Sequence, residues 1–330
     1  MRIAVVILNW NGVKLLEQFL PSILSFSAGA EIYVADNAST DDSVSFIKSN
    51  FPSVKIIQNS DNFGFAKGYN EALKQINADV YALVNSDIEV TENWLRPIID
   101  EFENNLQTAI IQPKIRDYKN KQKFEYAGAA GGFIDKYGFP FCRGRIFDTI
   151  ETDSGQYDDD CDIFWASGAC FFIRAEVFKQ LNGFDDEFFA HQEEIDLCWR
   201  AFNSGYSVRY LAGSVVYHVG GATLQQGNPH KTYLNFRNSL LMLQKNVPAA
   251  SLYGILLSRL IFDGIAGARF LIQGLPRHTL AIIRAHFSFY KMMNANALKR
   301  VPYQKRHYFK VGSIIRAYYI NGHKTYSELF

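Results

Sequence analysis

Continuous apolar runs alternate with amphipathic stretches along the first third of the chain. The runs lie at residues 3–8, 31–36, 54–57 and 80–84. Apolar side chains with the three-to-four spacing of a helix occupy residues 13–26, 43–50 and 65–76. Solid apolar runs are typical of strands that are buried on both faces of a parallel sheet. The alternation therefore predicts an α/β domain with a mostly parallel sheet and right-handed crossovers.

The fourth apolar run ends abruptly in three polar residues, Asn85, Ser86 and Asp87. Ligands of open α/β sheets bind outside the carboxyl ends of the strands, so Asp87 is expected on the floor of a site. A carboxylate there suits a divalent cation, because hard cations prefer oxygen ligands. An Asp after a strand also commonly caps the next helix. These residues by themselves leave both interpretations open.

Two glycines follow the third run, Gly64 at a predicted helix start and Gly68 one turn later. A backbone without side chains can approach a flat or anionic ligand closely at such a place. The spacing matches neither the dinucleotide fingerprint nor the P-loop. A helix start followed by a packing glycine explains the same residues, so nucleotide contact and packing stay equal alternatives.

The pattern loosens between residues 117 and 160, where glycines and aromatic residues predict a hairpin-rich excursion. Seven acidic residues lie between Asp148 and Asp162, and we interpret them as a solvated loop. Buried strand character returns at residues 163–174. Gly168 lies in the middle of that stretch, where it leaves room for a ligand against the backbone.

Glu193, Glu194 and Asp196 crowd the first turn of a predicted helix at residues 193–202. Acids at this end of a helix interact favourably with its dipole. They also follow two phenylalanines directly, and an acid beside apolar surface can be held as a general base. His218 lies just past a predicted strand at residues 214–217, which itself follows one at 206–211, and a histidine there is either structural or a ligand.

The last hundred residues differ in charge from the rest. Residues 230–330 carry fifteen Lys/Arg against two acids, a net charge of +13, and residues 1–229 carry −12. Helices are predicted at residues 231–245, 249–273, 277–294 and 303–319. Cationic helices with broad apolar faces either lie in a membrane interface or pack on the main domain, and the sequence leaves both open.

The longest uncharged apolar stretch, residues 247–258, is too short to span a membrane. The apolar run at the N-terminus is too short for a signal peptide. The four cysteines show neither a zinc-ligand spacing nor a disulfide framework. We therefore expect a cytoplasmic protein that works, if at a membrane, at the inner face.

Taken together, the short motifs resemble an inverting glycosyltransferase of family 2, and the subgroup it is most similar to is the rhamnosyltransferase-like enzymes of cell-surface polysaccharide assembly. The resemblance spans residues 1–245, and the matching segments are residues 6–12, 34–39, 62–70, 85–87, 168–169 and 183–197. It implies the nucleotide-binding GT-A fold, a Rossmann-like, mostly parallel sheet flanked by helices. We expect that domain at residues 1–229 and a basic, mainly helical region at 230–330.

The resemblance also implies roles for individual residues. Asp87 and His218 would hold Mg²⁺ or Mn²⁺ on the diphosphate, and Asn85 replaces the first Asp of the family's Asp-x-Asp motif. Glu194 would be the catalytic base, with Glu193 as the alternative. The implied nucleotide contacts are Asn9, Asn11, Asp36, Gly64, Lys67, Gly68 and Ser86, and the implied acceptor contacts are Trp165, Gly168 and Asp196.

The predicted function is metal-dependent transfer of a sugar from a UDP- or dTDP-linked donor to a hydroxyl of a glycan or lipid-linked acceptor. One alternative is a nucleotidyltransferase that makes an activated sugar. That class would carry a Gly-rich, basic signature after the first strand, which Asn9-Trp10-Asn11-Gly12 lacks. A non-catalytic protein that binds anionic surfaces is the other alternative. No nucleic-acid-reading motif appears in the basic region, so nucleic acid is not an expected partner.

Overall fold

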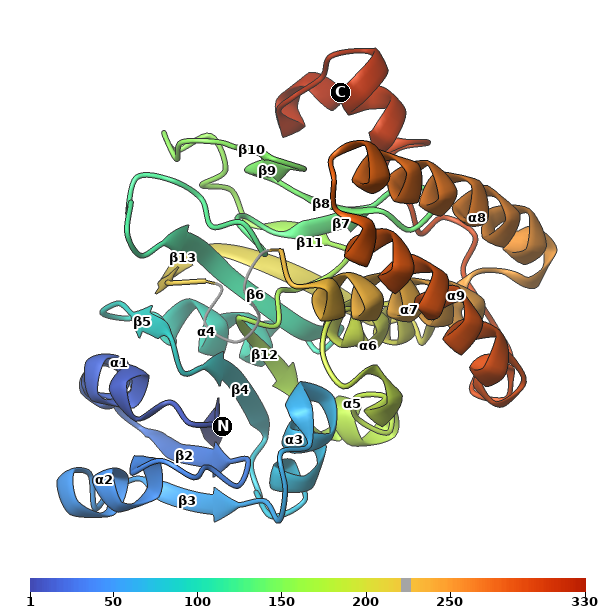
Figure 1. The fold of residues 1–330 in the computed structure, drawn as a ribbon. Coiled ribbons are helices and arrows are strands. Elements are labelled where there is room, and N and C mark those ends of the chain that lie inside the picture. The colour runs from blue at the N-terminus through green and yellow to red at the C-terminus, as the bar shows by residue number, and fades with distance from the viewer. Residues whose placement is uncertain (221–226) are drawn as a thin grey trace.

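The computed structural model describes residues 1–220 and 227–330 (Figure 1). Four parallel strands make one half of a large sheet, in the spatial order β4-β1-β2-β3. Their bounds are β1 (Ile3–Asn9), β2 (Ala30–Asp36), β3 (Lys55–Gln58) and β4 (Val80–Asn85). The predicted parallel α/β architecture is confirmed, because the apolar runs are covered on both faces.

Helices cover each face of this sheet with a separate hydrophobic core. One core includes side chains of α1 (Val13–Phe26), α2 (Ser43–Asn50) and α4 (Arg96–Asn104). The other includes side chains of α3 (Gly64–Leu73), α5 (Ala175–Gln180) and α6 (Glu193–Asn203). Leu16, Phe19, Leu20 and Ile23 form the buried face of α1 at the predicted helical spacing.

The second half of the sheet mixes strand directions. Strand β12 (Cys170–Arg174) runs antiparallel to β4 and to β6 (Thr108–Asp117), and β13 (Ser207–His218) runs parallel to β6. Short β5 (Ile88–Val90) and β11 (Cys161–Ile163) pair antiparallel with β13.

Two strand predictions need correction here. The single strand expected at residues 163–174 breaks into β11 and β12, because its ends pair with different neighbours, β13 and β4. The two strands expected at 206–211 and 214–217 are one strand, β13, whose register with β6 shifts between Leu211 and Val215. A local irregularity of this kind interrupts the sequence pattern without ending the strand.

The excursion predicted between residues 117 and 160 is a small antiparallel sheet. Its strands are β7 (Gly132–Ile134), β8 (Pro140–Cys142), β9 (Arg145–Ile146) and β10 (Thr149–Ile150). The acidic loop after it is only partly solvated. The side chain of Asp153 is buried, and its Oδ2 lies 3.2 Å from Lys114 Nζ and 2.7 Å from Arg116 Nη2. Burial works against the charge of Asp153, but hydrogen bonds and these cations outweigh it and lower its pKa.

Three long helices form the basic region, α7 (Pro229–Asn246), α8 (Ala249–Ile272) and α9 (Pro276–Ala297), on one flank of the sheet (Figure 1). Apolar residues of α7, including Leu240–Leu243, belong to the hydrophobic core that also contains side chains of α3, α5 and α6. The helix predicted at residues 303–319 is wrong for residues 303–313. Helical backbone begins only at Ile314 and continues through the π-helical Arg316–Ile320. Tyr308 is buried in the main core, the one that includes α3, α5 and α6, and the chain before Ile314 follows an irregular path.

Candidate active site

Polar residues meet at the carboxyl ends of β1 and β2. Asn9 and Asp36 are partners in the register, and Asn9 Nδ2 donates to Asp36 Oδ1 at 3.0 Å. Asp36 is fully buried and also accepts from the backbone and the hydroxyl of Ser39, at 2.9 and 2.5 Å. Asp36 therefore holds the loop that follows β2, and its carboxylate is already satisfied inside the protein.

The turn after β1 is joined to this loop. Asn11 is exposed and has a φ of 50°, and its Oδ1 accepts from Thr40 N at 2.7 Å. A Cβ at Gly12 would lie 2.4 Å from Asn9 Oδ1 and 3.8 Å from Ser86 Oγ, so Ser86 lies beside this turn. The structure thus brings Asn9, Asn11, Asp36 and Ser86 together at one edge of the sheet.

Gly64 and Gly68 are used for packing. Gly64 has a φ of +71°, and a Cβ there would lie 2.6–2.7 Å from the ring and the carbonyl oxygen of Phe189. A Cβ at Gly68 would lie 2.7 Å from Asn37. The first amides of α3, at Phe65 and Ala66, donate to Phe189 O. Lys67 is partly exposed, with its ammonium 4.3 Å from the centre of the Phe63 ring.

A buried carboxylate–imidazole pair lies at the end of β4. Asp87 Oδ1 is 3.1 Å from His218 Nε2, and both residues are buried. Glu125, also buried, has Oε1 3.2 Å from the other ring nitrogen, Nδ1. Burial by itself would lower the pKa of His218, but attraction to Glu125 and hydrogen bonds with both carboxylates raise it to about 10.

Sequence reasoning missed Glu125. It lies in the glycine-rich segment after β6, where nothing in the local pattern distinguishes it from a solvated acid. The structure places it 3.2 Å from the second ring nitrogen of His218, where a carboxylate holds the orientation of the ring. The donor set of Asp87 and His218, oxygen and nitrogen, is one that divalent cations accept.

Glu193 and Glu194 begin α6 after a strained turn. Phe189, His191 and Gln192 have φ values of 62°, 71° and 74°, which residues with a side chain rarely adopt. The Oε2 atoms of both glutamates are buried without a hydrogen-bond partner in the described part of the chain. Burial raises the pKa of Glu194 to about 7, and burial together with repulsion from Glu194 raises the pKa of Glu193.

Residues of α7 hold this strained turn, which the sequence also did not reveal. Asn238 is fully buried, and its Nδ2 lies 2.9, 3.0 and 2.7 Å from the carbonyl oxygens of Phe188, Ala190 and His191. Arg237 donates to Glu187 O at 2.8 Å. The basic helical region therefore supports the backbone that carries Glu193 and Glu194.

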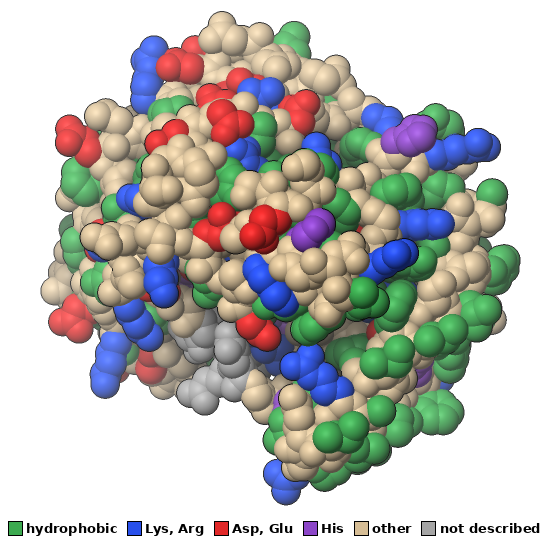
Figure 2. All heavy atoms as spheres, turned by 90° about the horizontal axis from the view of Figure 1, so that it is seen from above, with side chains coloured by type: hydrophobic (Ala, Val, Ile, Leu, Met, Phe, Trp, Pro, Cys, Tyr) green, Lys and Arg blue, Asp and Glu red, His purple; other side chains and the backbone are tan. Residues whose placement is uncertain are grey.

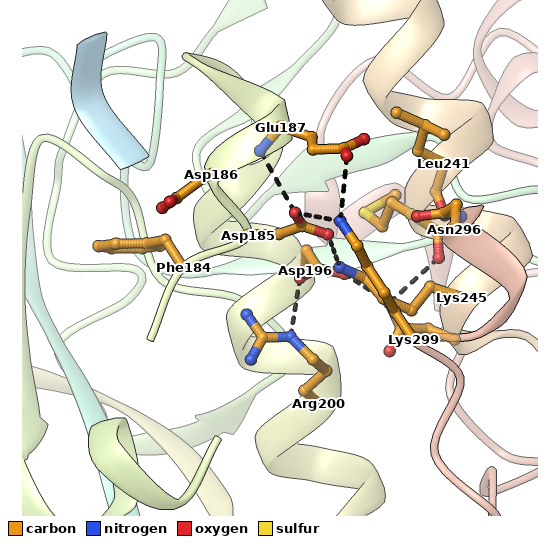
Figure 3. Close-up of polar contacts among 12 residues, drawn as sticks. Phe184, Asp185, Asp186, Glu187, Asp196, Arg200, Leu241, Lys245, Asn296 and Lys299 are labelled. Atoms are coloured by element: carbon orange, nitrogen blue, oxygen red, sulfur yellow. Dashed lines mark hydrogen bonds and ion pairs between the residues drawn. The ribbon is translucent and has the colours of Figure 1, made fainter. Parts of the chain in front are cut away.

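Asp196 does not face an acceptor site. Asp196 is fully buried, and its Oδ2 lies 2.8 Å from Arg200 Nε and 2.9 Å from Lys245 Nζ. Asp185 joins the same cluster through Lys245 and Lys299, both at 2.7 Å (Figure 3). The expected acceptor contact of Asp196 is thus corrected to a structural role, because its charge is used to join α6 to α7.

Trp165 is also inside the protein. Its indole lies where a Cβ of Gly132 would be, and its Nε1 donates to Phe133 O at 2.9 Å. With 3% of its surface exposed it offers no face to a sugar ring, so the predicted acceptor contact of Trp165 is corrected as well. The reason is that the small β7–β10 sheet covers it.

Gly168 connects the two groups of acids. A Cβ at Gly168 would lie 3.7 Å from Glu194 Cδ, so Glu194 stands directly beside it. The carbonyl oxygen of the next residue, Ala169, accepts a hydrogen bond from the backbone amide of Asn85 at 2.9 Å. Asn85 lies two residues before Asp87 in the chain. Asp87 and Glu194 therefore lie at the same end of the sheet, although more than a hundred residues separate them.

The family model of glycosyl transferase family 2 matches residues 4–181, more than half of the chain. The chain belongs to this family. As a family 2 glycosyltransferase it is an enzyme of sugar transfer, which agrees with the function predicted from its motifs.

Two curated relatives of this glycosyltransferase show how far the likeness extends. N-acetylglucosaminyl-diphospho-decaprenol L-rhamnosyltransferase of Mycobacterium tuberculosis is 24% identical over 220 residues, which are 62% of this chain and 71% of the relative. Low-salt glycan biosynthesis hexosyltransferase Agl10 of Haloferax volcanii is 22% identical over 248 residues, 72% of this chain and 74% of the relative.

Solved structures share the fold of the glycosyltransferase. GalNAc-T7 with UDP, GalNAc and Mn²⁺ superposes with a TM-score of 0.60 at 15% identity, over 92% of this chain but only 58% of that protein. TarS of S. aureus with UDP-GlcNAc has a TM-score of 0.59 at 16% identity, over 91% and 84%. At such identities the likeness concerns the fold alone, and that fold is the predicted GT-A arrangement.

The described residues of the glycosyltransferase contain neither a ready-made cluster of metal ligands nor a membrane-spanning helix. Within residues 1–220 and 227–330, no group of three or more His, Cys, Asp or Glu side chains is arranged to hold a metal ion. Nor does any helix there combine the length and hydropathy that crossing a bilayer requires. Asp87 and His218 would thus need further ligands to complete a cation site.

Proposed function

We propose that this glycosyltransferase transfers a sugar, with inversion, from a nucleotide-diphosphate sugar to a hydroxyl of a glycan or lipid-linked acceptor. One observation carries the proposal. Glu194, with a buried and unpartnered carboxyl oxygen, stands beside Gly168 at the end of the sheet where Asp87 and His218 also lie. A base and a leaving-group site on one edge are what a single displacement requires.

Inversion follows from one direct attack. The acceptor oxygen bonds to the anomeric carbon as the carbon–oxygen bond to the diphosphate breaks, and Glu194 takes the hydroxyl proton. A general base works best when its pKa lies near the working pH, and burial raises the pKa of Glu194 to about 7. The missing hydrogen-bond partner leaves Oε2 available for that proton.

Asp87 and His218 would hold the divalent cation, Mg²⁺ or Mn²⁺. When bound, the cation supplies neutralising charge to the departing diphosphate. Two protein ligands are few, and oxygens of the donor diphosphate would complete the set, as is usual for cations that work on phosphates. Glu125 orients His218 through Nδ1. We place the nucleotide at a rim made of Asn11, Ser86 and Lys67. The buried Asn9 and Asp36 support the loops of this rim through their hydrogen bonds.

The substrate class comes from the relatives. One is named for rhamnosyl transfer to a diphospho-decaprenol acceptor and another for glycan biosynthesis, and solved neighbours hold UDP or UDP-GlcNAc. We infer a UDP- or dTDP-linked hexose or deoxyhexose donor and a lipid-linked diphosphate acceptor. The reaction would belong to cell-surface polysaccharide synthesis at the inner face of the membrane.

The test is a transfer assay with a panel of nucleotide-diphosphate sugars, Mn²⁺ and a polyprenyl-diphosphate-sugar acceptor, with NMR assignment of the new anomeric configuration. Inverted product is expected. Glu194→Gln should lose turnover while the donor dissociation constant stays within about threefold, since the amide keeps the shape and only the base is removed. Asp87→Asn should weaken Mn²⁺-dependent donor binding instead.

Glu176→Gln is the matched control, because Glu176 is exposed on α5, outside the described site. It should behave as the wild type. Retained configuration in the product, or wild-type turnover in Glu194→Gln, would contradict the proposed mechanism.

A further inference from the structure

The outward faces of α8 and α9 are apolar. Exposed side chains recur every four residues along α8, at Tyr253, Leu257, Ile261 and Ile265, where 59–82% of each surface is exposed. On α9 the exposed apolar residues are Leu280, Ile283, Phe287 and Tyr290. A contiguous group of large apolar side chains on the protein surface usually marks an interaction site. We refer to these eight residues, with Arg277, Arg284 and Lys291, as the α8–α9 face.

The cations of the α8–α9 face are regularly placed. Arg277, Arg284 and Lys291 follow one another at seven-residue spacing on α9 and line a groove of about 710 Å³ against α7. The other residues lining this groove include Pro229, His230 and Tyr233 of α7. Seven residues are two helical turns, so all three charges lie on one side of α9.

Neither α8 nor α9 carries an exposed acidic side chain that could offset these charges. The one acid within α8 and α9 is Asp263, which is buried and lies 3.0 Å from His286 Nε2 and 3.5 Å from Arg259 Nε. Figure 2 shows the result on the surface: hydrophobic and basic side chains gather on the right of the view, over α8 and α9, whereas acidic ones gather elsewhere.

We propose that the α8–α9 face docks on an anionic lipid bilayer, with the apolar side chains in the interface and the cations among lipid phosphates. Helices with this composition lie in the plane of a membrane interface, and no described helix can cross a bilayer. A second copy of the chain fits less well, because two such faces would bring six uncompensated cations together. The inference rests on the proposed function in one respect: the docked enzyme reaches a lipid-linked acceptor.

A second cavity lies on the other side of the start of α7. The α7 residues of the groove, Pro229, His230 and Tyr233, alternate with Asn228, Lys231 and Thr232, which line this second cavity of about 190 Å³ together with Tyr126. Tyr126 follows Glu125, the partner of His218. The start of α7 therefore separates the groove from a second cavity, which is lined in part by the chain neighbour of Glu125.

The experiment is co-sedimentation of the full chain with vesicles of phosphatidylcholine alone or mixed with phosphatidylglycerol, at low and high salt. Binding is expected only to the anionic vesicles and should weaken with salt. The triple variant Arg277→Gln/Arg284→Gln/Lys291→Gln should bind on the order of 100-fold more weakly, since each cation near an anionic leaflet contributes about fivefold. The variant Leu257→Ser/Ile261→Ser/Ile265→Ser should also lose binding.

The matched control removes three exposed lysines from the other region, Lys14→Gln/Lys48→Gln/Lys119→Gln, and should bind as the wild type does. Circular dichroism verifies that each variant is folded. The proposal is overturned if the wild type does not bind anionic vesicles, if the charge triple binds as tightly as the control, or if light scattering shows that the apolar triple abolishes self-association without changing vesicle binding.

Transfer to a short water-soluble acceptor, measured on the same proteins, keeps the two proposals apart. The charge triple should retain this activity, because its residues lie outside the catalytic site. Vesicle binding without transfer from any donor would refute the proposed function alone. Transfer without vesicle binding would refute the membrane surface alone.

Discussion

Two pairs of buried carboxylates lie within residues 185–196, and they are treated in opposite ways. Asp185 and Asp196 share Lys245 and have further partners in Lys299 and Arg200 (Figure 3). Burial works against ionisation of Asp185, but the two lysines outweigh it and lower its pKa to about 2. Glu193 and Glu194 have no ion-pair partner among the described residues, and burial raises their pKa values.

The difference separates structure from chemistry. A buried acid with cations around it stays ionised over the whole physiological range and joins the elements that supply the cations. A buried acid without a cation exchanges its proton near neutral pH, which suits a base. The same helix, α6, therefore carries a structural carboxylate at Asp196 and a candidate catalytic one at Glu194, two residues apart.

The largest expected effect removes the unpartnered acid. Glu194→Gln should lower kcat by about 10²–10⁴-fold, the usual contribution of a positioned base, and should leave the folded protein at least as stable. Stability is preserved because no partner is left behind. Parallel measurements of kcat and urea unfolding would contradict the comparison if the variant lost stability and activity together.

Breaking the paired cluster should do the reverse. Asp196→Asn leaves Arg200 and part of the charge of Lys245 buried without compensation, so unfolding free energy should fall by about 3 kcal/mol. Urea unfolding at neutral pH measures this change. Glu187→Gln is the control: its side chain is 42% exposed and 3.8 Å from Lys299, so its effect should stay below about 1 kcal/mol. If Asp196→Asn lowered the unfolding free energy no more than Glu187→Gln does, the cluster would add no more stability than an exposed ion pair.

A smaller effect is expected from the support of the strained turn. Asn238→Ala removes the amide that faces the carbonyl oxygens of Phe188, Ala190 and His191, at a cost of about 1–3 kcal/mol in stability. The rate should fall roughly tenfold with little change in KM, because Glu194 is displaced while the nucleotide rim is intact. Asn104→Ala, which loses one exposed bond within α4, should change neither. An unchanged kcat in Asn238→Ala would leave the turn without a catalytic role.

The most subtle prediction is in pH dependence. Since a base must be ionised, kcat/KM should rise with pH through about 7, the pKa to which burial raises Glu194. That raised pKa also means that the folded state loses stability as pH increases from the ordinary carboxyl range to about 7, and Glu194→Gln should remove this slope.

The contribution of Asp185 to stability depends on pH in the opposite direction. Its lowered pKa contributes stability that is complete above the ordinary carboxyl pKa and is lost as pH falls toward 2. Urea unfolding measured across this range therefore should show acid destabilisation with activity already absent. An activity plateau that extends unchanged to pH 5 would exclude Glu194 as the base.

Much of the architecture was predictable because it depends on local patterns. The apolar runs became β1, β2, β3 and β4, and the amphipathic stretches became α1, α2 and α3. Predictions failed where a partner elsewhere decides the conformation. Tyr308 and Ile314 belong to the main core, so the chain between them does not form the helix that its spacing favours.

The sequence by itself determined the alternation of strands and helices and the polar strand ends, including Asp87, His218 and the acids that begin α6. Side chains a few residues apart share one face of an element, so a linear pattern reports on them directly. Only the tertiary structure decided which acids are paired. Lys245 and Asn238 meet residues 185–196 from a distant helix, and Glu125 meets His218 across the sheet edge. Such contacts depend on how whole elements pack, which no local pattern encodes.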